Sequence, residues 1–177
     1  MLNKHLITQA FKELDAILPD RVNLLIGGGS ALLLLKKIPI STMDIDAICF
    51  KSAITSEDLK PYREKVAEKL QLPPHWINEY FYEFTHCLPP DYNSRLIKYY
   101  RGRRLTCFVM SATDIAIMKL FAGRNKDLGH LRYLFAKKMV NLGLIETHLN
   151  NLTEISHPGV ERAVELFEEL RESLGIE

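Results

Sequence analysis

A run of three glycines directly after a short apolar segment constrains this chain more than any other feature. Residues 22–26 read Val-Asn-Leu-Leu-Ile, and residues 27–29 are all glycine. An apolar run that stops at glycines is typical of a buried strand that enters a tight turn. Because glycine has no Cβ, the backbone there can turn sharply and approach a ligand closely. The pattern predicts a helix after the turn, over 30–37, which Pro39 ends.

The glycine turn has two interpretations. Successive backbone N–H groups at a helix N-terminus form an anion site that suits a triphosphate. The alternative is a tight strand-to-helix turn that binds no ligand. The sequence around residues 27–30 is neither a Walker loop, since no Gly-Lys-Ser/Thr follows, nor the Rossmann fingerprint, since its third glycine is missing.

Two carboxylates follow the turn at a spacing of two residues. Asp44 and Asp46 lie in an alternating run, 44–50, that predicts a second strand, on which residues i and i+2 share a face. Two neighbouring carboxylates repel each other, and a divalent cation such as Mg²⁺ relieves the repulsion. The alternative is a solvated strand end, where Asp44 caps a turn and Asp46 faces water.

The rest of the chain alternates few strands with many helices. Strand-rich runs at 95–100 and 104–110 flank Arg101-Gly102-Arg103 and predict a hairpin. Helices are expected over 3–17, 56–70 (capped by Ser56), about 75–81, 112–122 (opened by a Ser111/Asp114 capping box), 127–140, 145–152 and 160–174. Helices gathered behind a few strands predict an α+β fold.

Composition narrows the class of protein without naming a partner. Hydrophobic residues make up 47% of the chain, which provides a core, and the net charge of +1 gives no overall attraction to nucleic acid or membrane. Cys49, Cys87 and Cys107 do not form a disulfide framework and suit a reduced cytosol. The N-terminus is amphipathic, unlike a signal peptide, and the longest apolar run, 31–35, is too short to span a bilayer. We therefore expect a cytoplasmic protein that does not bind membranes.

The glycine and aspartate motifs together resemble a known signature. Gly28-Gly29-Ser30-Ala31-Leu32 followed by Thr42-x-Asp44-Ile45-Asp46 is similar to the DNA polymerase beta-like nucleotidyltransferase superfamily, especially its minimal and abortive-infection-toxin branches. A second segment, from Ser111-x-x-Asp114 through Lys119 to Arg124-x-Lys126-Asp127, resembles later motifs of that family. The resemblance spans about residues 20–135.

The resemblance implies a nucleotidyltransferase fold with a small mixed sheet flanked by helices. The expected core is 1–110, and a helical part, 111–177, packs on it. By resemblance, Mg²⁺ or Mn²⁺ binds to Asp44 and Asp46, which act in catalysis with Lys119 and Asp127. The nucleotide is expected to bind Gly28, Gly29, Ser30, Thr42, Arg124 and Lys126.

Several of these residues also have ordinary interpretations. Lys119 lies in an apolar helix and either reaches water or faces a polar site. Asp127 is a metal or base partner, or the N-cap of the next helix, and Arg124 and Lys126 meet phosphates or solvate a loop.

The chain also departs from the family pattern. Ile40 stands where many relatives carry arginine, His130 replaces a second later aspartate, and the hairpin 95–110 lacks the common third carboxylate. Glu79 or Glu83 could supply that carboxylate, although surface roles fit them better.

The function expected from the resemblance is transfer of a nucleoside monophosphate from an NTP to RNA, a protein or a small molecule, as in a toxin–antitoxin system. The tip of the hairpin, Lys98–Arg104, carries basic and aromatic residues that could grip RNA or simply keep the hairpin soluble. The competing hypothesis is a non-catalytic protein that keeps the fold to bind a nucleotide or a partner protein.

Overall fold

The structure, a computed structural model, describes residues 1–36, 38 and 42–176. The predicted helix stop at Pro39 and the departure at Ile40 lie outside these residues. The chain forms two compact units. The first comprises residues 1–82 and 95–110, and the second comprises residues 83–94 and 111–177.

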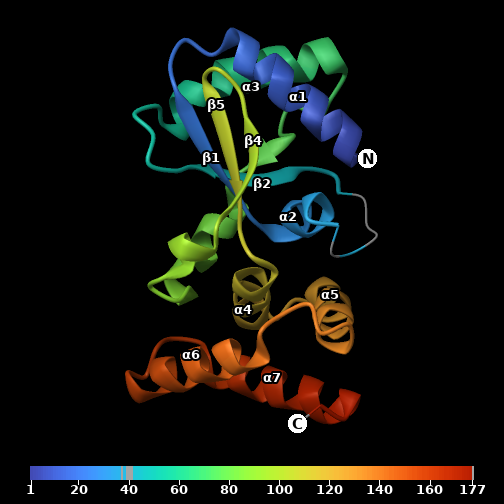
Figure 1. The fold of residues 1–177 in the computed structure, drawn as a ribbon, viewed down its shortest axis with the longest axis vertical. Helices are drawn as coiled ribbons and strands as arrows, with labels where there is room; N and C mark the ends of the chain where they lie inside the picture. Colours follow the sequence, from blue (N-terminus) through green and yellow to red (C-terminus); the bar gives the residue numbers. More distant parts are fainter. Residues whose placement is uncertain (37, 39–41, 177) are drawn as a thin grey trace. The chain divides into compact units, whose positions relative to one another are not determined.

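The first unit contains a mixed sheet. In the described part of the chain five strands are arranged in the order β3-β2-β1-β5-β4 (Figure 1). Strand β1 pairs antiparallel with β2 and parallel with β5, whereas β2 pairs parallel with β3, and β4 pairs antiparallel with β5. The strands are β1 (Val22–Ile26), β2 (Ile45–Cys49), β3 (Ile77–Asn78), β4 (Ile97–Arg101) and β5 (Leu105–Val109). The predicted α+β class, strand 22–26 and hairpin are confirmed.

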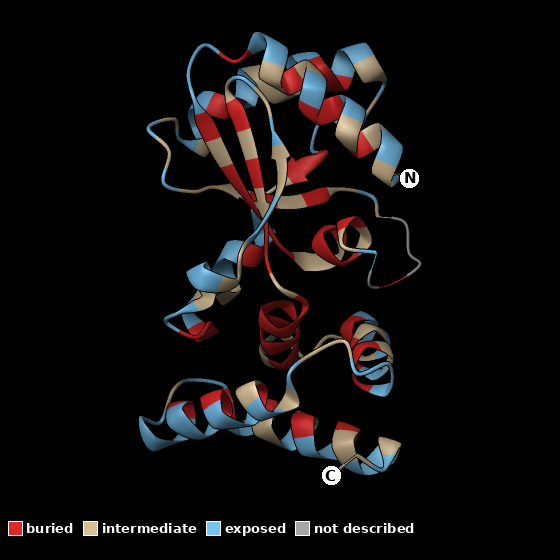
Figure 2. Ribbon diagram, viewed as in Figure 1, coloured by how far each residue is buried: buried red, intermediate tan, exposed pale blue. Residues whose placement is uncertain are grey.

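The two faces of this sheet differ in burial. Along β5, Leu105, Cys107 and Val109 are buried, whereas Thr106 and Phe108 between them are half-buried (Figure 2). On the buried face, helix α1 (Lys4–Ile17) packs through Phe11, whose ring centroid lies 5.8 Å from that of Tyr100. Successive side chains on a strand point to opposite faces, so the half-buried residues share the other face.

Three local predictions for the first unit are corrected. Helix α2 spans Gly28–Leu34 and begins at the glycines, because extended Gly27 is its N-cap. Helix α3 (Ser56–Leu70) is capped by Thr55 rather than Ser56, in a reciprocal capping box with Asp58. The short helix expected at 75–81 is wrong. Residues 77–78 form β3 beside β2. Two 3₁₀ helices follow, at Tyr80–Cys87 (η1) and Tyr92–Arg95 (η2), and most of their residues belong to the second unit.

The second unit is helical. Its α-helices are α4 (Ala112–Ala122), α5 (Asn125–Ala136), α6 (Leu142–Glu154) and α7 (Val160–Leu174). The predicted bounds of α4 and α7 are confirmed, and Ser111 caps α4 by accepting a hydrogen bond from the Asp114 N–H. The rings of Phe135 and Phe167 join α5 to α7, with centroids 5.8 Å apart. No helix in the described residues has the length and apolar character needed to cross a membrane.

Candidate functional site

The carboxylate of Asp46 lies against the first residue of helix α2. A Cβ added to Gly28 would lie 1.9 Å from Asp46 Oδ2 and 2.6 Å from Asp46 Cγ, so any side chain there would displace the Asp46 carboxylate. Gly28 also has a φ of +57°, a left-handed conformation that residues with a side chain rarely adopt. Both observations require glycine at this position, and together they place the Asp46 carboxylate on the backbone of the glycine turn.

Hydrogen bonds fasten the glycine turn to strand β2. The Gly27 N–H donates to the Asp46 carbonyl oxygen at 2.9 Å, and the Asp46 N–H donates to Ser30 Oγ at 3.2 Å. The Ser30 hydroxyl in turn donates to the Gly27 carbonyl oxygen at 3.0 Å, and Ser30 is fully buried. The hydroxyl predicted to bind phosphates is therefore engaged in holding the turn against β2. Gly29, the second residue of α2, has no side chain and presents only backbone.

Asp44 and Thr42 form the approach to β2. Asp44 lies in a bend one residue before the strand, which is shorter than the predicted 44–50. The Thr42 hydroxyl donates to the Asp44 carbonyl oxygen at 2.8 Å, and the Leu2 N–H donates to the Thr42 carbonyl oxygen at 2.7 Å. Only Asp46 lies in the strand, so the rule that residues i and i+2 of a strand share a face does not place the Asp44 carboxylate beside that of Asp46. Both aspartates are half-exposed.

Strand β3 brings a polar residue beside Asp46 that the sequence did not single out. Asn78 is the register partner of Asp46, and its Oδ1 accepts a hydrogen bond from the Tyr80 N–H at 3.0 Å. Glu79, directly after β3, is exposed. Burial first, and the Glu79 charge to a smaller extent, raise the pKa of Cys49, which points to the opposite face of β2 from Asp46. Because β3 is only two residues long, no hydrophobic pattern in the sequence could reveal this pairing.

An aromatic side chain from η1 also packs on the glycine turn. A Cβ on Gly27 would lie 2.9 Å from the ring of Phe81, which is 5% exposed. Its neighbours Tyr80 and Tyr82 are 56% and 64% exposed. The aromatic run in the sequence was a signal for this contact, but its segment was expected to be an ordinary short helix.

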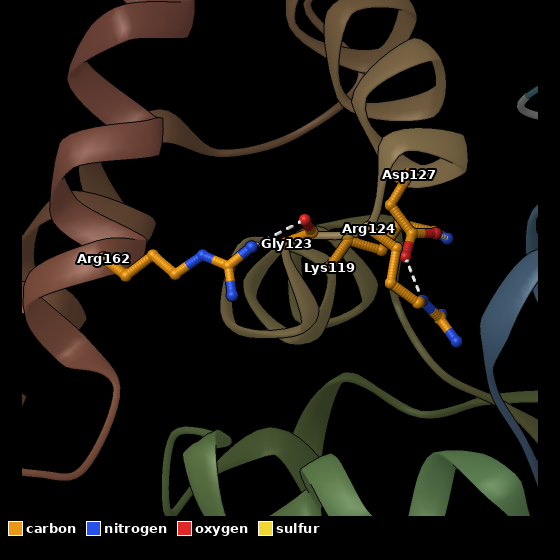
Figure 3. A network of polar contacts seen from close by, with 5 residues as sticks. All are labelled: Lys119, Gly123, Arg124, Asp127 and Arg162. Carbon is orange, nitrogen blue, oxygen red and sulfur yellow. Dashed lines mark hydrogen bonds and ion pairs between the residues drawn. The ribbon is translucent and has the colours of Figure 1, made fainter.

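The later motif forms a buried charge network in the second unit. Lys119 Nζ donates to Asp127 Oδ1, and Arg124 Nε donates to Asp127 Oδ2 at 2.7 Å (Figure 3). The side chains of Lys119 and Asp127 are 6% and 1% exposed. Burial tends to raise the pKa of Asp127, but the charges of Lys119 and Arg124 and their hydrogen bonds lower it below the ordinary value. Asp127 is therefore an ionised partner of two cations.

The ends of α4 and α5 hold this network in place. Gly123 ends α4 in a left-handed conformation, and its carbonyl oxygen accepts a hydrogen bond from Arg162 at 2.9 Å (Figure 3). Arg124, not Asp127, is the N-cap of α5, so the N-cap interpretation of Asp127 is wrong. Lys126 is exposed. His130 Nδ1 is buried and has no hydrogen-bond partner among the residues that the structure describes. Burial, followed by the Lys119 charge, lowers the His130 pKa.

The tip of the β4–β5 hairpin is anchored to α1. The Asp15 carboxylate accepts hydrogen bonds from the N–H groups of Arg103, Arg104 and Leu105, at 2.7 to 3.1 Å. The Arg104 guanidinium also donates to the Leu18 carbonyl oxygen. Part of the basic tip predicted to grip RNA is therefore used to hold the hairpin, whereas Lys98, Arg101 and Arg103 are exposed.

Comparison with known families fits this arrangement. Residues 5–169 match the family described as "Nucleotidyltransferase of unknown function (DUF6036)". The chain belongs to this nucleotidyltransferase family. No curated protein and no solved structure matches the sequence.

The oxygen donors beside the glycine turn are of the kind that a hard divalent cation prefers. The carboxylates of Asp44 and Asp46 and the amide oxygen of Asn78 are oxygen donors, which Mg²⁺ prefers over nitrogen or sulfur. Among the described residues no group of three or more His, Cys, Asp or Glu side chains could hold a metal ion. A cation at this site would therefore take its remaining ligands from phosphate oxygens and water, as Mg²⁺ commonly does in sites of phosphate chemistry.

Proposed function

We propose that this protein transfers a nucleoside monophosphate from an NTP to a hydroxyl group of an acceptor. The observation that carries the proposal is the Asp46 carboxylate seated on Gly28, at a left-handed position where a side chain would displace it. We infer that a metal ion held by this carboxylate would bring phosphate oxygens to the glycine backbone. The membership of the chain in a nucleotidyltransferase family supports the same reaction.

In the proposed reaction the hydroxyl oxygen of the acceptor attacks the α-phosphorus of the NTP. A bond forms between that oxygen and the α-phosphorus, and the bond to the oxygen that bridges to the β-phosphate breaks. Pyrophosphate leaves, and the hydroxyl proton passes to solvent. Catalysis of this kind depends on positioning and on neutralising charge rather than on covalent chemistry by the protein.

Each part of the chain has a proposed task. The backbone at Gly28 and Gly29 lies close to the phosphates, and Ser30 and Thr42 keep Asp46 and Asp44 in position through the hydrogen bonds described above. Asp44 and Asp46 would hold Mg²⁺ or Mn²⁺, which when bound neutralises phosphate charge.

The later motif has a proposed task in the same reaction. Lys119 offsets negative charge on the phosphoryl group. Asp127 is a positioning residue, because both of its oxygens accept hydrogen bonds from Lys119 and Arg124. Arg124 and Lys126 remain proposed phosphate contacts.

A second candidate function is nucleotide binding without transfer. The observation that favours it is the Asn78 amide beside Asp46, where a third carboxylate would strengthen metal binding. In that case the protein would act as a nucleotide sensor or as one part of a two-protein module, and a toxin-like activity would be absent.

One experiment separates these candidates. The protein is incubated with each α-³²P-labelled NTP, Mg²⁺ or Mn²⁺, and either total RNA or a protein extract, and labelled products are separated by electrophoresis. We expect label on an acceptor with wild type and with the control Asp20→Asn, which changes an exposed aspartate. Asp46→Asn should lose at least about a hundredfold in rate. Saturable NTP binding by wild type with no labelled product in any mixture would favour the sensor.

A further inference from the structure

The sheet face that bears Thr106 and Phe108, on which Leu25 of β1 is fully buried, carries two aromatic rings. Phe108 of β5 and Phe50, just after β2, contact edge to face with ring centroids 6.2 Å apart. Phe50 is held in place because its N–H donates to the Asn23 carbonyl oxygen at 2.9 Å, and Asn23 Nδ2 donates to the Lys51 carbonyl oxygen at 3.1 Å. Both rings are half-buried. The face therefore presents a fixed pair of rings rather than scattered apolar residues.

Cations surround these rings. Lys51 Nζ lies 5.2 Å from the ring centroid of Phe50, and Lys98 Nζ lies 5.9 Å from that of Phe108. Arg101 is the register partner of Thr106, which alternates with Phe108, so Arg101 lies on this same face. Lys51, Lys98 and Arg101 are exposed. This combination of rings and cations suits a ligand that carries both flat bases and negative charges.

Asp46 lies on the same face of the sheet. It precedes Phe50 by four residues along β2, which is about 13 Å at roughly 3.3 Å per residue. Ile48 lies between them, and its register partner on β1 is Leu25. The rings and cations therefore lead along one strand to the carboxylate of the proposed transfer site.

We propose that this face, which we call the ring platform (Phe50, Lys51, Lys98, Arg101 and Phe108), binds single-stranded RNA as the acceptor. The inference rests on the proposed function and names its substrate class. Bases stack on the two rings, phosphates meet the three cations, and the chain runs along β2 toward Asp46. The half-buried Thr106 hydroxyl beside the rings offers a hydrogen-bonding group for a 2′-hydroxyl, which distinguishes RNA from DNA.

The cation contacts in the free protein are compatible with base stacking. A base that stacks on Phe50 or Phe108 displaces the lysine from the ring face toward the adjoining phosphate. Stacking of a base contributes more than an exposed cation–π contact, so the exchange favours the base. An acidic protein segment would meet the same cations but would have no flat group for the rings.

The test is fluorescence anisotropy with a labelled twelve-nucleotide single-stranded RNA, without NTP or metal and at several salt concentrations. Phe50→Leu/Phe108→Leu keeps apolar volume but removes the rings, and it should weaken binding about tenfold or more. Lys98→Gln/Arg101→Gln should make the negative slope of log K against log salt shallower by about 1.4. The matched control is Tyr62→Leu/Lys65→Gln, which removes another cation–ring pair, on helix α3. In that pair Lys65 Nζ lies 6.0 Å from the centroid of the Tyr62 ring. The control variant should bind RNA as tightly as wild type does.

Two further nucleic acids serve as comparison probes. Single-stranded DNA and duplex RNA of the same sequence should bind more weakly than single-stranded RNA. The proposal is overturned if no saturable RNA binding occurs, if the leucine double variant binds as wild type does, or if either comparison probe binds equally well. Should the leucine variant fail to fold, Lys98→Glu/Arg101→Glu at exposed positions should abolish binding, whereas Lys65→Glu should not.

The two proposals can fail separately. Ring-dependent RNA binding without any nucleotide transfer would overturn the proposed function and leave the ring platform standing. Transfer to a protein acceptor without RNA binding would overturn the ring platform and leave the proposed function standing.

Discussion

Asp46 Oδ2 occupies the space in which Gly28 would carry a side chain, 1.9 Å from an ideal Cβ position. Gly28→Ala must therefore move the carboxylate, and it must also hold a left-handed residue at a cost of about 1–2 kcal/mol. We expect a lower melting temperature and a loss of NTP binding and of transfer. Calorimetric titration with NTP and thermal unfolding measure the two effects.

Gly129→Ala is the matched control for this substitution. A Cβ on Gly129 meets nothing within 4 Å, and the residue lies inside helix α5. Alanine there should stabilise the protein by roughly 0.5–1 kcal/mol without any change in NTP binding. A Gly28→Ala protein that binds NTP as wild type does would remove the glycine turn from the site.

The buried Lys119–Asp127 pair predicts an unequal response to single and double substitutions. Lys119→Met leaves one oxygen of a carboxylate that is 1% exposed without its cation, which should cost up to about 3–5 kcal/mol of unfolding free energy. Lys119→Met/Asp127→Leu removes both charges and should recover most of that loss in urea unfolding. Neither variant should transfer nucleotide. Equal stability of Lys119→Met and wild type would contradict the buried pairing.

The sequence predicted those parts of the fold whose signals are local. The apolar run of β1 ends at glycines, and Ser111 and Asp114 mark the start of α4, so the bounds of both elements agree with the prediction. The sequence placed Gly28 and Asp46 in one site only by resemblance to the family, and it did not predict their contact. Its detail depends on a left-handed backbone and a strand register, and neither has a signature in a single sequence.

Other features could not be predicted because they depend on residues far apart in the chain. Asn78 reaches Asp46 through a two-residue strand, and Asp15 reaches the hairpin tip across nearly ninety positions. The motif predicts that the Ser30 hydroxyl binds phosphates. In the structure this buried hydroxyl forms hydrogen bonds with the backbone of Gly27 and of Asp46 in β2. Buried polar groups need partners, and only the fold determines which partners they find.

Asp15 predicts a loss of stability in acid. Burial tends to raise its pKa, but the N–H groups of Leu105, Arg104 and Arg103 lower the pKa below the ordinary value near 3.8. A carboxylate whose folded-state pKa is depressed stabilises the protein above its unfolded-state pKa, and this contribution is lost as the pH falls through the folded-state value. Asp15→Asn should therefore flatten the decline of the urea midpoint below about pH 5. Asp20→Asn, at an exposed position, is the control, and an unchanged decline in Asp15→Asn would refute the anchoring of the hairpin.

Asn78 offers a direct way to strengthen the proposed metal site. Asn78→Asp places a third carboxylate beside Asp46, keeps the size of the side chain and retains an oxygen that can accept the Tyr80 N–H. Because a cation relieves the added repulsion, Mg²⁺ or Mn²⁺ should bind more tightly and stabilise the variant more than wild type. Without metal, the same repulsion should make the variant less stable than wild type. Thermal unfolding in EDTA and across a Mn²⁺ titration measures both effects. Glu79→Gln, which changes the exposed next residue outside the strand, should leave the metal dependence unchanged. If Asn78→Asp and wild type respond equally to metal, Asn78 does not border a cation site.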